Sequence, residues 1–118
     1  MPNDVLIVED DGIIALDFEE TILGFGVGRV RSCGSTVRAL RLIEERAPDF
    51  ALLDVGLAGG NSFAVAERLQ AMKIPFAFVT GYGKRVGLPP ALSDAPTLPK
   101  PCTRDMLEAA LRQRSRRG

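Results

Sequence analysis

Phe50-Ala51-Leu52-Leu53-Asp54 is an apolar run that ends at a single carboxylate. A continuous apolar run, rather than an alternating one, is typical of a strand buried on both faces of a parallel sheet. The same pattern occurs in Val5-Leu6-Ile7-Val8, which ends at Glu9 and Asp10, and in Pro75 to Val79, which ends at Thr80. These stretches predict buried parallel strands with a polar group at the end of each.

Amphipathic helical patterns separate the apolar runs. The first follows the first strand and ends at Gly24 and Gly26, and the second begins at a cap on Ser35 or Thr36 and ends near Arg46, before Pro48. Imperfect alternation over residues 27–33 predicts a strand near a sheet edge. The positions that we expect to face the core are Ile13, Leu16, Ile22 and Leu23 in the first helix and Val37, Leu40 and Ile43 in the second.

Shorter elements follow in the second half of the chain. A glycine-rich loop after Asp54 leads to a helix that Asn61 or Ser62 can cap, and Thr97-Leu98 can be only a brief last strand. Thr103 can cap a final helix, and we expect the basic tail at 112–118 to fray. The inward positions of these two helices are Phe63, Ala66 and Leu69, and then Met106, Leu107, Ala110 and Leu111.

The strict alternation of strands and helices predicts an α/β fold with right-handed crossovers. We expect one domain over residues 1–118, built on a doubly wound five-stranded parallel sheet in the flavodoxin-like order 2-1-3-4-5, with helices on both faces. Glycines and prolines are dense between Gly81 and Pro99, so the fourth helix should be short or irregular.

Composition excludes several classes of function. The chain is 46% apolar and 25% charged, which is ordinary for a folded domain, and its 15 basic and 15 acidic residues cancel, so we expect no nucleic-acid partner. Without histidine it cannot be a histidine phosphodonor, nor use sites that need imidazole. Cys33 and Cys102 form no metal or disulfide pattern. No apolar run is long enough for a signal peptide or a membrane span, so we expect a cytoplasmic protein without a membrane partner.

Polar groups end four of the predicted strands: Glu9 and Asp10, Asp54, Thr80 and Lys100. Since the carboxyl ends of parallel strands meet at one edge, three carboxylates would converge there, which requires a cation or a proton. Oxygen ligands suit Mg²⁺, and a hydroxyl and an ammonium can bind phosphoryl oxygens. This set predicts phosphoryl transfer to a carboxylate. Simpler roles stay open at this point: the acids could cap the first helix, as we expect for Asp11, and Asp54 could begin a turn.

Four segments in this order and spacing resemble the response-regulator receiver domain of two-component systems: Val8-Glu9-Asp10-Asp11, Leu52-Leu53-Asp54-Val55, Val79-Thr80-Gly81 and Pro99-Lys100-Pro101. The resemblance covers nearly the whole chain. It implies that Asp54 is the phosphoacceptor, and that Glu9, Asp10, Asp54 and the Gly56 carbonyl hold Mg²⁺. It also implies that Thr80 and Lys100 bind the phosphoryl group.

The resemblance also implies partners. These are a sensor histidine kinase or a histidine phosphotransfer protein as donor, and a downstream protein target. The implied activity is a signalling switch or a phosphate sink, with self-catalysed phosphorylation and dephosphorylation rather than turnover of a substrate. A pseudo-receiver, which keeps the fold without the chemistry, is the alternative, although no acid, threonine or lysine of the set is missing. A flavodoxin-like cofactor binder would need a phosphate loop where this chain has acids.

The stretch Phe78-Val79-Thr80-Gly81-Tyr82-Gly83 is similar to the motif of the FAT GUY group of single-domain receivers, with Val79 where that group prefers alanine. Receivers usually carry an aromatic residue three positions before the lysine, and this chain has Thr97 there. Tyr82, the only tyrosine, is a candidate replacement. We expect the segment from Gly81 to Pro96 to be loosely ordered at rest and to act as the switch and partner surface. Lys100-Pro101 is a candidate cis peptide bond.

Overall fold

The computed structural model describes residues 1–57, 60–81 and 87–117, with side chains up to Arg112. Seven strands and five helical segments alternate along these residues. In chain order they are β1 (Asp4–Val8), α1 (Gly12–Leu23), β2 (Arg29–Cys33), α2 (Thr36–Glu45), β3 (Phe50–Asp54), β4 (Gly56–Leu57), β5 (Gly60–Asn61), α3 (Phe63–Ala71), β6 (Phe76–Gly81), the 3₁₀ turn η1 (Pro90–Leu92), β7 (Thr97–Lys100) and α4 (Arg104–Arg117).

The central sheet has five parallel strands in the order β2-β1-β3-β6-β7. This confirms the predicted fold class and strand order. Both β1 and β3 are buried along their whole length, as their continuous apolar sequences require. The glycine-rich loop after Asp54 is more regular than expected, because β4 and β5 form a small antiparallel hairpin there.

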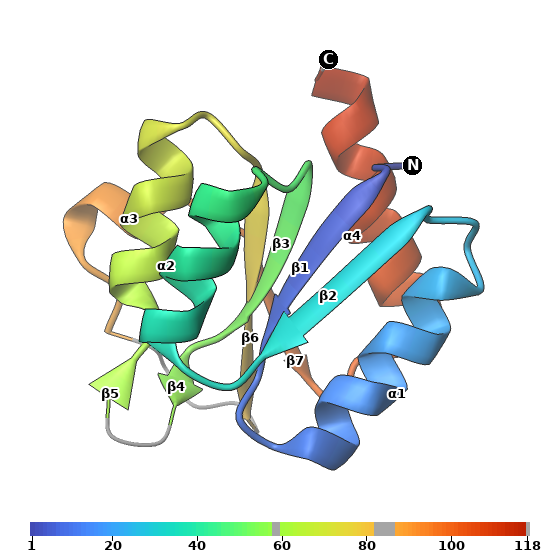
Figure 1. Cartoon of the computed structure of the whole chain (residues 1–118), viewed down its shortest axis with the longest axis horizontal. Coiled ribbons are helices and arrows are strands. Elements are labelled where there is room, and N and C mark those ends of the chain that lie inside the picture. Colours follow the sequence, from blue (N-terminus) through green and yellow to red (C-terminus); the bar gives the residue numbers. More distant parts are fainter. Residues whose placement is uncertain (58–59, 82–86, 118) are drawn as a thin grey trace.

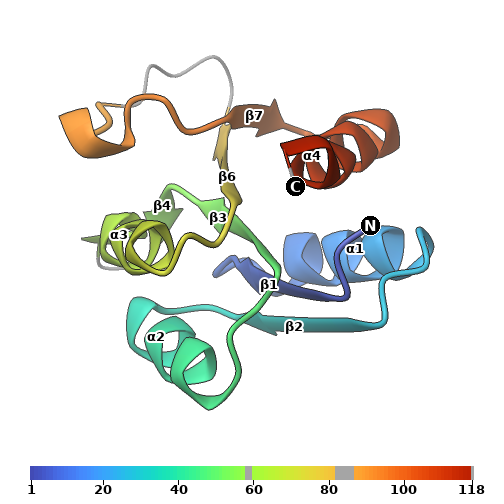
Figure 2. The ribbon, with the colours of Figure 1, turned by 90° about the horizontal axis from the view of Figure 1, so that it is seen from above.

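Helices cover both faces of the sheet, as Figure 2 shows, with α1 and α4 on one face and α2 and α3 on the other. Each face has its own apolar core. Leu6, Ile43 and Leu69 belong to the core under α2 and α3, and Ile7, Phe18 and Leu107 to the core under α1 and α4. The two chain ends lie close together at one end of the sheet, opposite the carboxyl ends of the strands (Figure 1).

The predicted inward face of α1 was wrong in part. Ile13 is 84% exposed, Leu16 and Leu23 are exposed as well, and the residues that pack inward are Ala15, Phe18 and Ile22. Apolar residues surround the first two turns on nearly every side, so periodicity could not single out the inward face. In α2, Val37 is likewise exposed, and the buried positions are Ala39 and Ile43.

Side-chain caps start α1, α2 and α4 at the expected places. Asp11 accepts hydrogen bonds from the N–H groups of Ile13 and Ile14, and Ser35 accepts one from Arg38. Thr103 accepts one from Met106 at the start of α4. These bonds satisfy donors that the first turn of a helix leaves without acceptors. The capping role predicted for Asp11 is confirmed.

The connection between β6 and β7 contains one helical turn, η1, among its described residues. This agrees with a short fourth helix, but its second half is better packed than expected. Leu92 is buried, and the Gln70 side chain donates a hydrogen bond to the Ala91 carbonyl from α3. Residues 82–86, which include Tyr82, lie outside the described residues. The backbone of α4 is helical to Arg117, and the expected fraying of 112–118 stays a prediction.

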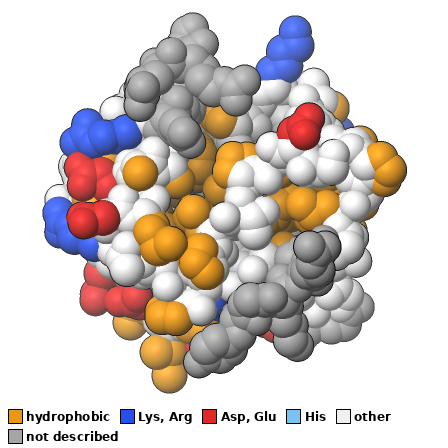
Figure 3. Space-filling model, turned by 180° about the vertical axis from the view of Figure 1, so that it is seen from behind, with side chains coloured by type: hydrophobic (Ala, Val, Ile, Leu, Met, Phe, Trp, Pro, Cys, Tyr) orange, Lys and Arg blue, Asp and Glu red, His pale blue; other side chains and the backbone are white. Residues whose placement is uncertain are grey.

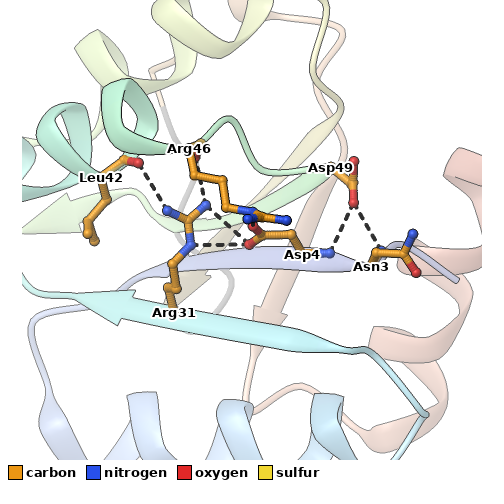
Figure 4. A network of polar contacts seen from close by, with 6 residues as sticks. All are labelled: Asn3, Asp4, Arg31, Leu42, Arg46 and Asp49. Atoms are coloured by element: carbon orange, nitrogen blue, oxygen red, sulfur yellow. Dashed lines mark hydrogen bonds and ion pairs between the residues drawn. The ribbon is translucent and has the colours of Figure 1, made fainter.

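An ion-pair network ties β1, β2 and α2 together at the amino ends of the strands (Figure 4). The buried Asp4 carboxylate lies 3.1 Å from Arg31 and 3.1 Å from Arg46. Arg31 also donates hydrogen bonds to the carbonyls of Leu42 and Arg46, at the last turn of α2. Asp49 accepts the backbone N–H groups of Asn3 and Asp4. Nothing in the sequence pattern indicated this network.

No helix among the described residues has the length and apolar character needed to cross a membrane.

Candidate functional site

The carboxyl ends of β1, β3, β6 and β7 place the predicted site residues at one edge of the sheet. Pairing of β3 with β6 sets Asp54 beside Val79, so that Thr80 lies one residue beyond it, and pairing of β6 with β7 sets Gly81 beside Lys100. Glu9 follows β1, and its N–H donates to the Cys33 carbonyl at the end of β2. Parallel pairing therefore brings together residues that are far apart in sequence.

Lys100 bridges two of the acids. Its ammonium nitrogen lies 2.8 Å from Glu9 Oε1 and 3.1 Å from Asp54 Oδ2. Both carboxylates are buried, with Glu9 3% and Asp54 8% exposed. The other oxygen of Glu9 accepts the backbone N–H of Asp11. The peptide bond after Lys100, to Pro101, is cis, as suspected from the sequence.

Burial affects the pKa values of Glu9 and Lys100. It raises the pKa of Glu9 to about 7, and the nearby Asp54 adds to the rise, although Lys100 and the Asp11 N–H act in the opposite direction. Burial alone would lower the pKa of Lys100, but its contacts with Glu9 and Asp54 outweigh that effect and raise it. One ammonium thus does not fully offset the two buried carboxylates at neutral pH.

The acids fit a divalent cation. Glu9, Asp10 and Asp54 each offer an oxygen, and these oxygens lie within 4.8 Å of one another. Glu9 and Asp54 are buried, whereas Asp10 is exposed. A set of carboxylate oxygens open to water on one side suits a hard cation such as Mg²⁺. The raised pKa of Glu9 indicates the same need for additional positive charge.

Thr80 and Gly56 are the remaining predicted site residues, one in β6 and one in β4. Thr80 is buried near the end of β6. Gly56 is exposed in β4, two residues after Asp54. The structure brings Glu9, Asp10, Asp54 and Lys100 together, while the roles assigned to all six residues stay predictions.

A cavity of about 530 Å³ beside Lys100 was not expected from the sequence. One wall is formed by Ile13, Ile14 and Phe18 of α1, and the other by Lys100, Pro101 and Cys102. Ile13 was the sequence feature that could have indicated this cavity, but the helical pattern assigned it to the core. Burial raises the pKa of the Cys102 thiol, and the thiol donates a hydrogen bond to the Pro99 carbonyl, so it stays protonated at neutral pH.

Comparison with known proteins identifies relatives over almost the whole chain. The family model of the response regulator receiver domain matches residues 5–112. The phyllosphere-induced regulator PhyR of Methylorubrum extorquens is 32% identical over 88 residues, which are 72% of this chain and 33% of that protein. The transcriptional regulatory protein AfsQ1 of Streptomyces coelicolor is 33% identical over 124 residues, covering 100% of this chain and 53% of that protein. The chain thus spans a third to about half of these relatives.

Solved structures show the same fold. The solution structure of SdrG from Sphingomonas melonis Fr1 is 37% identical, with a TM-score of 0.82 and 96% of each chain covered. The receiver domain of PhyR from Erythrobacter litoralis is 21% identical and superposes with a TM-score of 0.84 over 96% of this chain and 89% of that one, which shows the fold alone. Because the family model spans nearly all of the strands and helices that form the acidic edge, the chain belongs to the response regulator receiver domains of two-component systems.

Proposed function

We propose that this chain accepts a phosphoryl group on the Asp54 carboxylate. The observation that carries the proposal is the position of Lys100, whose ammonium contacts both Asp54 and Glu9 at the carboxyl ends of the strands. A carboxylate held between a cation and further acids can act as a nucleophile toward phosphorus, once the charge of the incoming group is offset. Asp54 ends β3, the central strand of the sheet.

The roles of the other residues follow from their positions. Glu9, Asp10, Asp54 and the Gly56 carbonyl would hold Mg²⁺, which would supply positive charge against the phosphoryl oxygens. The Thr80 hydroxyl and the Lys100 ammonium would each donate to a phosphoryl oxygen.

The donor would be a phosphohistidine on a sensor kinase or on a phosphotransfer protein, since this chain has no histidine of its own. An Asp54 oxygen forms the new bond to phosphorus as the nitrogen–phosphorus bond breaks, and the imidazole leaves with that electron pair and takes a proton. The donor protein must cover the acidic edge for its histidine to reach Asp54. The apolar cavity between α1 and Pro101 adjoins that edge and would bury part of the contact.

The signal would pass to a downstream protein through contacts, or end with the chain as a phosphate sink, in the cytoplasm. Figure 3 shows apolar side chains across the face of the molecule opposite that of Figure 1. Leu88 and Ala95, between β6 and β7, are half-buried apolar residues that pack against the core under α2 and α3. This face, together with residues 87–96 between β6 and β7, is our candidate output surface.

Incubation with Mg²⁺ and acetyl phosphate, followed by intact mass measurement, tests the proposal. We expect one added phosphoryl group, lost in Asp54→Asn and in excess EDTA. Asp49→Asn serves as the matched control, because Asp49 is an acid at the opposite end of the sheet. A phosphorylated Asp54→Asn variant would reassign the acceptor. Absence of labelling in the native chain, with the histidine phosphodonors also tried, would favour the pseudo-receiver.

A further inference from the structure

Ser62 stands where the loop after Asp54 enters α3, and its hydroxyl is the unusual feature. The residue is 0% exposed, and its oxygen has no hydrogen-bond partner. Burying a hydroxyl without a partner is unfavourable, so such groups are rare in folded proteins. Neighbouring Val65, Ala66 and Leu57 belong to the apolar core, which gives the hydroxyl nothing to bind.

The first turn of α3 has backbone N–H groups that lack acceptors among the described residues. The Ser62 N–H donates to the Val55 carbonyl, and the Phe63 N–H donates to the Asn61 side chain. The next two donors, the N–H groups of Ala64 and Val65, find no acceptor among the described residues. A serine at the start of a helix normally accepts from one of these two groups. The N–H groups of Ala64 and Val65 and the Ser62 hydroxyl are therefore close in sequence but form no hydrogen bond with each other.

Backbone conformation explains why the cap is not formed. Asp11 and Ser35, which do cap their helices, have extended backbones with ψ of 111° and 157°. Ser62 has ψ of 15°, which turns its side chain away from the N–H groups that it would accept. A rotation of Ser62 into the extended region would form the cap and give the buried hydroxyl a partner.

The same rotation would move the backbone beside Asp54. Ser62 follows directly on β5, whose residue Asn61 pairs with Gly56 of β4. Gly56 is the residue whose carbonyl we assign to the metal. At rest, the Thr36 hydroxyl of α2 donates a hydrogen bond to the Asn61 carbonyl of β5. This bond fixes the position of β5 relative to α2. Figure 1 shows the hairpin between α2, α3 and the end of β3.

We propose that Ser62 is a positioning residue for the phosphoryl site, with its cap open at rest and closed when the site is loaded. The inference rests on the proposed function, since it takes Gly56 as a ligand of the loaded site. When the Gly56 carbonyl is drawn toward the site, the hairpin shifts and Ser62 turns into the extended conformation. Its hydroxyl then accepts from the Val65 N–H. Loading is favoured because the cap forms only in that state.

The test uses Mg²⁺ with beryllofluoride, a phosphoryl mimic for which an activated structure of the related SdrG exists. Affinity should be about fivefold weaker in Ser62→Ala than in the native chain, because the variant cannot form the cap. Ser62→Cys, close to serine in size but a poor acceptor, should weaken it similarly. Ser32→Ala removes a serine hydroxyl that donates to Glu19 of α1, outside the phosphoryl site and the β6–β7 connection, and should bind as the native chain does. Nuclear magnetic resonance should show the Val65 amide proton becoming hydrogen-bonded on loading in the native chain only.

Resting stability separates this role from a purely structural one. Without ligand, Ser62→Ala should unfold at the same temperature as the native chain or a higher one, since it removes an unpartnered buried hydroxyl. Equal affinities of Ser62→Ala and the native chain would overturn the inference and leave the proposed function intact. A large loss of resting stability in Ser62→Ala would also overturn it, by showing a structural bond at rest. Failure of the native chain to bind the mimic at all would overturn both.

Discussion

Glu9 is a buried acid whose pKa of about 7 lies well above the ordinary value of 4.5. Between these values the folded chain keeps a proton that the unfolded chain has lost. The free energy of unfolding should therefore fall as pH rises from about 4.5 to 7, and change little from this source at higher pH. For the metal-free protein we expect a loss on the order of 1–3 kcal/mol, measured by urea denaturation across this range.

Glu9→Gln should remove most of this pH dependence, because the amide does not titrate. Glu20→Gln provides the matched control, since Glu20 is exposed on α1. A native chain whose stability is constant between pH 5 and 7.5 would contradict the assignment to Glu9. So would a Glu9→Gln variant with an unchanged slope.

Lys100 is the cation that the structure places between Glu9 and Asp54. Lys100→Met keeps the aliphatic stem and removes the charge, which leaves two buried carboxylates without their ammonium. At pH 8 and without metal we expect a loss of about 2–4 kcal/mol in the free energy of unfolding, because breaking a buried pair leaves an uncompensated charge. Added Mg²⁺ should restore a large part of it. Lys73→Met, at an exposed position after α3, should cost little.

Between elements, Arg31 of β2 contacts both Asp4 of β1 and the end of α2. Arg31→Met would leave the Asp4 carboxylate with the largely exposed Arg46, and the last carbonyls of α2 without these donors. We expect a loss of about 2–4 kcal/mol in the free energy of unfolding. Arg29→Met lies two residues away on the same strand, is exposed, and should lose less than about 0.5 kcal/mol. Equal losses in the two variants would show that the network contributes nothing specific.

Element types and their order were predictable because each buried strand is a short apolar run with a polar end, as in Val5 to Glu9 and Phe50 to Asp54. The inward faces of helices were less predictable. Ile13 and Val37 are as apolar as their buried neighbours, and only the crossover geometry decides which side of the helix meets the sheet. The β4–β5 hairpin was missed because two residue pairs leave no periodic pattern.

The convergence of Glu9, Asp54 and Lys100 was also predictable, since parallel strands bring their carboxyl ends to one edge. Their contacts could not be predicted. That Lys100 touches both acids depends on side-chain directions and on burial, which a sequence does not state. The open cap at Ser62 was hidden for the same reason: the sequence predicts that Asn61 or Ser62 caps α3, whereas in the structure the Asn61 side chain accepts the Phe63 N–H and Ser62 forms no cap.

For the molecule as a whole, metal binding should raise the thermal stability of the folded chain. A ligand at a hundred times its dissociation constant adds about 2.7 kcal/mol, which corresponds to a rise in Tm of roughly 10 °C for a chain of this size. We expect this rise with Mg²⁺ and its reversal by EDTA, measured by thermal unfolding. Asp10→Ala should reduce the rise strongly.

Asp11→Ala gives the matched comparison, because Asp11 is the neighbouring acid and caps α1. It should lower the Tm of the metal-free chain, since the cap is lost, yet preserve the rise on adding Mg²⁺. Equal rises in Asp10→Ala and the native chain would remove Asp10 from the set of metal ligands.

The two ends of the chain emerge at the end of the sheet opposite Asp54 (Figure 1). A label, a surface anchor or a fused protein attached at either end therefore leaves the acidic edge open to a donor. A pair of dyes attached at the two ends would report the distance between the ends and not the phosphorylation of Asp54. Immobilisation through the amino end is accordingly the favoured geometry for measuring donor binding on a sensor surface. A dye intended to follow loading belongs on the β4–β5 side of the molecule.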